Sequence, residues 1–361
     1  MKTIAFKKDK SENSFSTRLT KEYNEYFKDK SVKGTSTLRK KTRIIFIGLL
    51  VSYCIALLSN FIVPNVILGT ILSFIGFGAV GIYVALVGFN IMHDASHGSY
   101  SDDTEKNRKL AEIAASYMGG NRLFWHYKHD IVHHTYTNIV GVDHDISKSP
   151  MFRFAPSHPL KWFHKYQHIY CWPLYGLMTL YWFYFDDFVT YKNKKIGDYE
   201  FTINKEEKKL FWKGKLINIS VFLLIPILLL GWQGLIGFLI LNIVTSLSLS
   251  LVFQMAHVVE GVSFYAIPKE GEELDIWHIH QVQTTANFAE NNKFLTKWLG
   301  GLNRQRVHHI WRNISHEHYP PLSTKVQKVC NEMNIKYISF PTFGAAIASH
   351  YRHLKALGQA A

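Results

Sequence analysis

Two long stretches of the sequence contain no charged residue. One lies between Arg43 and Asp94, and the other lies between Lys215 and Glu260. Each far exceeds the roughly 20 apolar residues that cross a bilayer once. Turn signals near their middles are Pro64-Asn65 and Gly231-Trp232-Gln233-Gly234. The pattern therefore predicts two helical hairpins with four membrane spans, at about 44–63, 66–92, 216–231 and 234–257. A soluble protein with two long, buried helical hairpins is the alternative.

A third apolar stretch, residues 169–185, is uncharged and rich in Trp and Tyr. These side chains prefer the membrane–water interface, and Pro173 and Gly176 interrupt the run. One additional crossing would also place the histidines before it and those after it on opposite sides of the membrane, where they could not share a site. We therefore expect residues 169–185 to form an interfacial helix in the headgroup region.

Positive charge is concentrated beside the predicted spans, within a formal net charge of +14. Two clusters precede the first and the third span: Arg39, Lys40, Lys41 and Arg43, and Lys205, Lys208, Lys209, Lys213 and Lys215. The turns within the hairpins carry no charge. The positive-inside rule therefore predicts that both termini and the segment between the hairpins are cytoplasmic. Such clusters also attract anionic lipid headgroups, and their placement argues against a nucleic-acid-binding protein.

The rest of the chain is expected to surround these spans on the cytosolic side. Residues 1–38 are lysine-rich, lack the apolar core of a signal peptide and are predicted to form a cytosolic N-terminal tail. Residues 39–361 are predicted to form one membrane domain, whose cytosolic part comprises 93–168, 186–215 and 258–361. The scattered cysteines predict neither a disulfide framework nor a thiolate metal site. They are Cys54, Cys171 and Cys330.

Most of the 19 histidines occur in clusters. HDASH contains His93 and His97, HDIVHH contains His129, His133 and His134, and QRVHH contains Gln305, His308 and His309. A spacing of four places two imidazoles on one helix face, as chelation from a helix requires. His257 stands alone near the end of the fourth span, at the depth of His93, where an unpartnered ionisable group is unfavourable. A lone histidine is usually structural and one HxxxH motif can arise by chance, but three clusters on one side of the membrane favour a metal site.

Eight clustered imidazoles point to two metal ions. No cysteine lies near the clusters, and eight ligands exceed the four that a tetrahedral zinc can use. Imidazole binds Fe, Cu, Zn and Ni, so the ligand type alone leaves the element open. Eight ligands would serve two metal ions with four ligands each. A pair of irons could store electrons for dioxygen chemistry, whereas zinc could not.

HDASH, HDIVHHTYTN and QRVHH resemble the three histidine boxes of the membrane fatty acid desaturases. Gln305 at the start of the third box, HQVQTTANFA at 280–289 and GGLN at 300–303 are similar to the front-end acyl desaturases, and the resemblance extends from about His93 to Pro320. It implies an all-α membrane protein, in which four transmembrane helices in two hairpins lie under a cytosolic helical cap with a di-iron site. It also implies that a histidine of the fourth span joins the boxes. The implied iron ligands are His93, His97, His129, His133, His134, His257, His308 and His309, and Gln305 is a further candidate catalytic residue.

The resemblance implies a fatty acyl desaturase that uses dioxygen and two electrons to introduce a cis double bond, in the manner of the front-end Δ5 and Δ6 enzymes. Its substrate would be an acyl-CoA or an acyl-lipid. No HPGG haem motif of a fused cytochrome b5 domain is present, so a separate ferredoxin or cytochrome b5 with its reductase is expected, and a basic surface would attract an acidic donor. Two alternatives are a membrane di-iron hydroxylase or ketolase acting on a lipid, alkane or carotenoid, and a non-catalytic metal-binding or transport protein. Transporters usually carry ionisable residues at the midplane of their spans, which this sequence lacks.

The third box departs from the family pattern F-Q-I-E-H-H-L-F-P. Val307 replaces the glutamate, Arg312 replaces the proline, and Arg304 and Arg306 add further charge. A carboxylate beside a ligand imidazole orients the ring and raises its basicity. We therefore expect a normally placed box with altered surroundings, in which Val307→Glu would improve the orientation of an imidazole. The alternative is that the arginines dock an anionic headgroup or an acidic electron donor.

The remaining histidines are assigned simpler roles. We expect orientation of ligands or capping of helices from His126, His278, His280, His316 and His318. His144, with Asp143 and Asp145, is expected to shape a loop near the substrate entrance. A surface or interfacial position is expected for His158, His164, His168, His350 and His353.

Overall fold

The computed structural model describes residues 4–9, 11–147 and 149–359, most of which are helical. The first elements are α1 (Phe15–Phe27), α2 (Ser36–Ile62), α3 (Val66–Val87), η1 (Gly88–Met92), α4 (His93–Ser96), α5 (Thr104–Met118), α6 (Arg122–Trp125) and η2 (His126–His133). The central elements are α7 (His144–Ser147), η3 (Trp162–Tyr166), α8 (Gln167–Gly176), α9 (Met178–Tyr181), η4 (Trp182–Asp186), α10 (Asp187–Asn193), β1 (Lys195–Ile196) and β2 (Tyr199–Glu200). The last elements are α11 (Lys205–Ile219), η5 (Ser220–Leu224), α12 (Ile225–Leu230), α13 (Trp232–His257), α14 (Trp277–Gln283), β3 (Asn287–Phe288), α15 (Lys293–Trp298), α16 (Gln305–Ile310), η6 (His316–His318), α17 (Tyr319–Glu332), β4 (Ser339–Phe340) and α18 (Phe343–Gln359).

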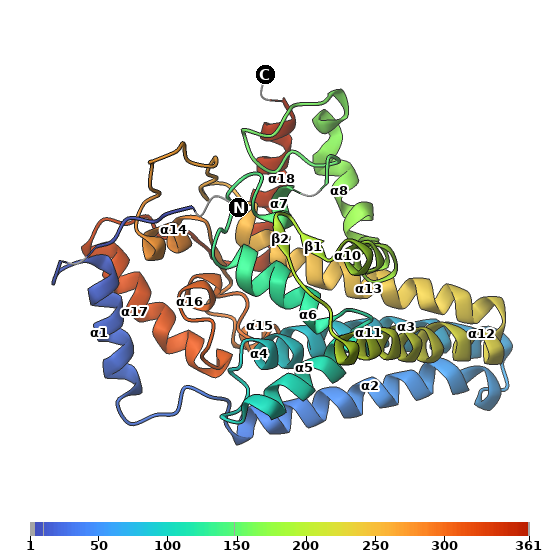
Figure 1. Ribbon diagram of the computed structural model, residues 1–361. Coiled ribbons are helices and arrows are strands. Elements are labelled where there is room, and N and C mark those ends of the chain that lie inside the picture. Colours follow the sequence, from blue (N-terminus) through green and yellow to red (C-terminus); the bar gives the residue numbers. More distant parts are fainter. Residues whose placement is uncertain (1–3, 10, 148, 360–361) are drawn as a thin grey trace.

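Four helices among the described residues are long and apolar enough to cross a membrane. They are Ser36–Ile62, Val66–Ser96, Lys205–Leu230 and Trp232–His257. Figure 1 shows them side by side, with the α2–α3 turn and the α12–α13 turn at the same end of the bundle. The predicted architecture of four apolar helices in two hairpins is therefore confirmed.

Local chemistry explains where the hairpins turn and how closely their helices pack. The Asn65 side chain accepts a hydrogen bond from the backbone N–H of Leu68 and so caps the start of α3. Gly231 has a φ of +59°, a conformation that glycine adopts without steric cost. At Gly76 a Cβ would lie 2.6 Å from the backbone nitrogen of Ala56. The absence of that atom lets α3 approach α2 closely, as small residues do between membrane helices.

The aromatic stretch at 169–185 forms α8, α9 and η4, with a break at Leu177, and it is not one of the four long apolar helices. In Figure 1, α8 runs across the bundle of long helices rather than along it. Ile169, Tyr181 and Phe185 expose about half of their surface or more. A helix with this direction and these exposed side chains fits the predicted interfacial position, which stays a prediction.

The N-terminal segment packs against the C-terminal part of the chain. The backbone of Lys7 bonds to Leu274, and Phe15 and Leu19 of α1 are fully buried. Both side chains belong to an apolar cluster that also contains Val307 of the third histidine box. Residues of the predicted tail therefore support the helices that carry the histidines.

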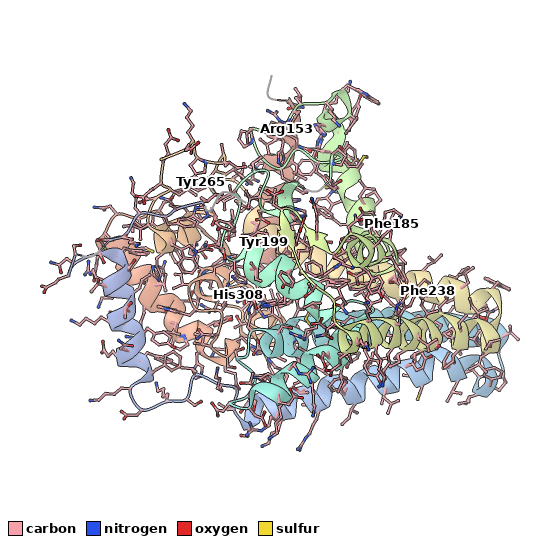
Figure 2. The ribbon with its side chains drawn as sticks, viewed as in Figure 1. Arg153, Phe185, Tyr199, Phe238, Tyr265 and His308 are labelled. Atoms are coloured by element: carbon pink, nitrogen blue, oxygen red, sulfur yellow. The ribbon has the colours of Figure 1, made fainter. Side chains whose placement is uncertain are left out.

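Helices α14, α16, α17 and α18 gather at the end of the bundle opposite the hairpin turns (Figure 1). Figure 2 shows Phe238 within the long helices and His308 beyond their end. The cluster of histidines lies at this junction between the apolar bundle and the cap.

Candidate metal centre

All eight histidines of the predicted ligand set lie in one cluster. Seven are buried and His129 is half-buried. Ring nitrogens within 4.8 Å of one another define overlapping groups: His93, His97, His129 and His308; His133, His257 and His309; and His134, His308 and His309. The structure thus unites residues that are up to 216 positions apart in the sequence, from His93 to His309.

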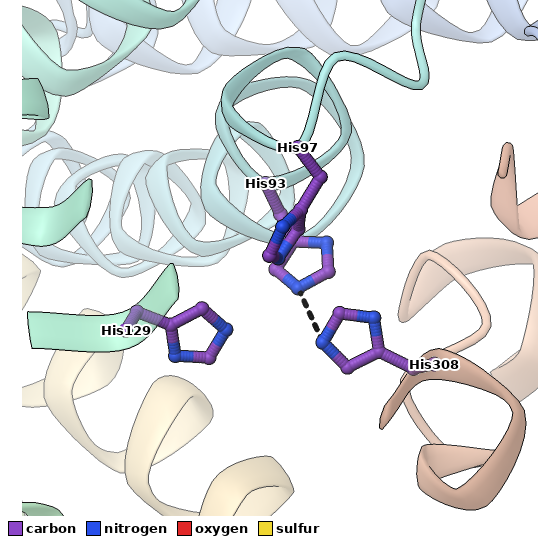
Figure 3. Close-up of side chains that lie close together, drawn as sticks. All are labelled: His93, His97, His129 and His308. Atoms are coloured by element: carbon purple, nitrogen blue, oxygen red, sulfur yellow. Dashed lines mark hydrogen bonds between the residues drawn. The ribbon is translucent and has the colours of Figure 1, made fainter. Parts of the chain in front are cut away.

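The first group comes from three separate segments. His93 and His97 lie at the end of the second long helix, His129 lies on η2, and His308 lies on α16 (Figure 3). Nε2 of His93 is 3.1 Å from Nε2 of His308. Two imidazole nitrogens at this distance repel one another through their lone pairs unless a proton or a cation lies between them.

The second box is a π-helix, whereas the sequence pattern predicts an α-helical pair. The backbone N–H of His134 bonds to the carbonyl of His129, five residues earlier, at 3.0 Å. A π turn brings residues four and five positions apart to the same side, and such turns often occur at functional sites. This geometry explains how His129, His133 and His134 all reach the cluster. Nε2 of His134 lies 3.1 Å from Nε2 of His129.

The second group confirms the predicted proximity of His257 to the boxes. His257 is the last residue of α13, and its ring centroid lies 4.7 Å from that of His133 and 4.8 Å from that of His309. It is fully buried, and both its ring nitrogens have no hydrogen-bond partner among the described residues. An imidazole with two unsatisfied nitrogens is costly to bury, so its position favours a role as a ligand.

Several rings have one nitrogen near an outer partner and the other facing the cluster; the outer contact is a hydrogen bond for His133, His308 and His309 and an ion-pair contact for His97. The outer contacts are His97 Nδ1 to Asp130 Oδ1 at 2.8 Å, His133 Nδ1 to Asp143 Oδ2 at 3.0 Å, His308 Nδ1 to Tyr319 Oη at 3.1 Å, and His309 Nδ1 to Gln281 Oε1 at 2.9 Å. Nε2 of His97, His133 and His309 has no hydrogen-bond partner within the described residues. Metal-binding histidines have this arrangement, in which the outer partner selects the tautomer and orients the ring. The donor set therefore fits a metal centre.

Burial keeps most of these imidazoles neutral. It lowers the pKa of His97 to about 4 although Asp130 opposes the shift. The pKa values of His129, His134, His308 and His309 lie well below the ordinary value, because burial and the neighbouring imidazoles disfavour the cation. Burial also disfavours the cation of His133, but the adjacent Asp143 carboxylate favours it, and the net result is a raised pKa of His133. Neutral rings offer the lone pair that a metal requires.

Two carboxylates that contact histidines at the site were not among the residues predicted from the sequence, although each directly follows a box histidine. Asp94 accepts from His316 at 2.8 Å, and Asp130 contacts His97 and His126. Asp143 was expected to shape a loop near the substrate entrance. In the structure it also bonds to the buried ring of His133. The signal that could have identified the first two is the HD dipeptide that opens both HDASH and HDIVHH.

The unusual residues of the third box are accounted for by packing. Val307 is fully buried in the apolar cluster with Phe15 and Leu19. This position argues against the expectation that a glutamate there would orient an imidazole, because an uncompensated carboxylate is costly to bury. Gln305 is buried at the start of α16, and no hydrogen bond among the described residues joins its side chain to the histidines.

The arginines of this box have internal partners. Arg304 bonds to Glu290 at 3.0 Å, and Arg306 is fully buried, bonds to the carbonyls of Val282 and Ile338, and stacks on Tyr337. Burial of these two residues rules out the alternative that they dock a headgroup or a donor. Arg312 is partly exposed and bonds to Asp130.

The other histidines have mixed outcomes. His126 and His316 each share a carboxylate with a cluster histidine, as the expected orienting role requires. His278 bonds to Ser16, His280 lies 2.9 Å from the carbonyl of Thr137, and His318 bonds to Tyr26. A surface or interfacial position was expected for five more histidines, and three of them are buried, so that a surface position is wrong for His164, His168 and His350.

Comparison with known proteins gives a consistent result over most of the chain. The fatty acid desaturase family model matches residues 65–341. The sn-1 linoleoyl-lipid 6-desaturase of Synechocystis sp. is 32% identical over 352 residues, which cover 95% of this chain and 95% of the relative. The protein of the same name from Arthrospira platensis is 32% identical over 98% of this chain and 93% of its own length. The acyl-lipid (8-3)-desaturase of Physcomitrium patens is 34% identical over 77% of this chain and 59% of its own length.

Proposed function

This chain belongs to the fatty acid desaturase family, as an oxidoreductase of the front-end type, and from that premise we propose that it introduces a cis double bond at carbon 6 of a fatty acyl chain carried by a membrane lipid. The observation that carries the proposal is the match, over nearly their full length, to two desaturases whose names specify a linoleoyl chain on a lipid. It favours a lipid-linked substrate over an acyl-CoA. The hydroxylase or ketolase alternative receives no support, because these relatives are desaturases.

We further propose that the histidine cluster holds two irons. The first would be held by His93, His97, His129 and His308, and the second by His133, His134, His257 and His309. The support is the fit of eight mostly neutral imidazoles, several with an outward hydrogen bond and an inward free nitrogen. Imidazole alone does not select iron over other transition metals. Iron is favoured here because desaturation needs a centre that changes oxidation state.

Bound at these residues, the irons would supply the oxidising power by which dioxygen, two electrons and two protons remove two hydrogens from adjacent methylenes and form two waters. The chain itself positions the ligands and keeps the site dry. Phe253 of α13 lies against His133 and His257, with ring centroids 5.2 and 4.8 Å away. Trp125 stacks on His129 at 4.4 Å. These aromatic rings cover two sides of the cluster and reduce the access of water to it.

The protonation of the ligands is set by their outer partners. The carboxylate of Asp143 accepts a hydrogen bond from the Nδ1–H of His133, which leaves the lone pair of Nε2 for metal. Gln281 does the same for His309 through its side-chain oxygen, at 2.9 Å. These contacts orient the rings before any metal binds, and so reduce the cost of assembling the centre.

We propose that both termini, the cap and the metal centre face the cytoplasm. The hairpin turns at the opposite end of the bundle carry no charge. The predicted basic clusters are mostly exposed near the cap; the exceptions are Lys41 and Lys215, which are buried and bond to internal groups. The α8–η4 stretch, with Trp162 of η3 exposed by 79%, would lie in the headgroup region on this side.

Electrons would come from a separate ferredoxin or cytochrome b5 with its reductase. The net charge of +14 supports an acidic donor, because opposite charges raise the rate of encounter. The association rate should therefore fall as salt is added.

The proposal is tested by expressing the full chain in a desaturase-deficient host and measuring fatty acids by gas chromatography with mass spectrometry. The expected product has a new cis double bond at carbon 6, and it should appear first in isolated membrane lipids rather than in the acyl-CoA pool. Metal analysis of the purified protein should show iron. His309→Ala should abolish the product, whereas His353→Ala, outside the cluster, should retain it. A hydroxylated product, or protein that holds only zinc, would contradict the proposal.

A further inference from the structure

Arg312 connects the third histidine box to the second. It lies two residues after the end of α16, and its Nη1 donates to the backbone carbonyl of Asp130 at 2.7 Å. Its Nε lies 3.5 Å from Oδ1 of the same residue. Carbonyls in the last turn of a helix lack partners within the helix, and Asp130 is in the last turn of η2. The guanidinium therefore both caps η2 and contacts the carboxylate.

The two carboxylate oxygens of Asp130 contact different histidines, one in the cluster and one beside it. Oδ1 lies 2.8 Å from Nδ1 of His97, and Oδ2 lies 2.9 Å from Nδ1 of His126. The side chain of Asp130 is 11% exposed, so water provides little support for its position. The carboxylate sits between the first box, through His97, and the third box, through Arg312.

We propose that Arg312 is a positioning residue of the metal centre, which holds Asp130 against His97 and so fixes the orientation of that ring. The inference rests on the proposed metal-binding function. Because the three boxes lie on separate segments, their relative placement depends on contacts between them, and Arg312, Asp130 and His97 form one such contact. The alternative is that Arg312 docks a headgroup or an acidic donor from the solvent, because 42% of its side chain is exposed.

The expected effect is smaller than that of a residue in direct contact with a ligand. Loss of an outer partner of a metal-binding histidine costs about 10–100-fold in metal affinity or activity. Arg312 acts through Asp130 and is partly screened by solvent. Its removal should therefore have an effect near or below the lower end of that range.

The test measures the rate at which a chelator removes iron from purified, full-length protein. Asp130→Asn should accelerate iron loss by about 10–100-fold, and Arg312→Ala by roughly tenfold or less. Arg312→Lys keeps the charge but loses the forked geometry, and should fall between Arg312→Ala and the wild type. In the double variant the two effects on iron loss should combine to less than their product, because both substitutions break the contact between Arg312 and the Asp130 carboxylate. The matched control is Arg352→Ala, which removes an exposed arginine of α18 that forms an ion pair with Glu260.

A second measurement needs no metal. Hydrogen exchange in the metal-free protein should be faster across residues 126–134 in Arg312→Ala, and unchanged there in Arg352→Ala. A wild type that binds no iron would contradict the proposed function, and exchange alone would then decide whether Arg312 holds η2. The inference is overturned if Arg312→Ala exchanges and releases iron like the wild type. It is also overturned if the variant keeps normal exchange and iron and only weakens donor affinity in a salt-dependent way.

Discussion

Nδ1 of His316 lies 2.8 Å from Oδ2 of Asp94, although 222 positions separate the two residues in the sequence. The other ring nitrogen of His316 bonds to Lys41, which also donates to the carbonyl of Lys297 at 3.0 Å. Oδ1 of Asp94 lies 3.7 Å from Nδ1 of His93. A buried chain of contacts thus joins the first long helix to the first histidine box.

Replacing His316 should weaken the metal centre although His316 is no ligand. His316→Ala removes the partner that holds Asp94, and leaves a buried carboxylate and the Lys41 ammonium without their shared contact. Iron affinity or turnover should fall by about 10–100-fold. Iron content and activity of the purified variant measure the effect. His353→Ala is the control, because its ring lies outside the cluster, where it contacts the carbonyl of Phe154 and the ring of Phe264. Equal values for the two variants would argue against the chain of contacts.

His257→Ala should reduce iron content and turnover as far as His133→Ala does. Both rings belong to the group completed by His309, and His257 has no other hydrogen-bond partner among the described residues. Loss of a ligand lowers metal affinity as well as activity, so both quantities should be measured on the same preparation. Normal iron and normal turnover in His257→Ala would make that residue structural.

Val307→Glu should destabilise the protein rather than improve its metal site. The side chain is fully buried beside Phe15 and Leu19, and an uncompensated carboxylate there costs about 3 kcal/mol or more. Val307→Ala, which removes only apolar atoms, should cost about 1–2 kcal/mol. Thermal unfolding and the yield of folded protein distinguish the two variants. A glutamate variant as stable as the wild type, with tighter iron binding, would restore the opposite interpretation.

Acid should destabilise the metal-free protein, in part through His350. This ring donates to the carbonyl of Val258 and accepts from Tyr175, and burial lowers its pKa to about 4. The unfolded chain binds a proton at about pH 6.5, and the folded chain does so only near pH 4. Stability is therefore fully present above pH 6.5 and falls as the pH is lowered toward 4, by about 3 kcal/mol at most for this group.

His350→Gln isolates this contribution. The variant should be less stable at neutral pH, but its unfolding temperature should fall less steeply between pH 6.5 and 4.5 than that of the wild type. His158→Gln is the comparison, because its ring is only about half-buried. Parallel pH profiles for wild type and His350→Gln would show that His350 does not contribute to acid sensitivity.

Much of the architecture could be predicted because it depends on local pattern. Two charge-free runs with a central turn signal are sufficient to define two hairpins, since a charged group in the bilayer is costly. The histidine boxes were equally visible, because a helix segment that chelates metal needs ligands at short, fixed spacings. His257 could be predicted from its depth in the fourth helix. The π-helical geometry of η2 could not, because nothing in HDIVHH distinguishes an α turn from a π turn.

The sequence by itself therefore determined the membrane helices, the positions of the histidines and the family to which they point. Only the tertiary structure decided which residues support the ligands. Asp94, Asp130 and Tyr319 contact partners on other segments, and the sequence does not reveal which residue a carboxylate or a hydroxyl will contact. The same holds for Arg304 and Arg306, whose charge suggested an exposed surface but whose side chains are buried with internal partners. The physical reason is that hydrogen bonds and ion pairs form between atoms a few ångströms apart, and chain folding sets those distances independently of separation along the sequence.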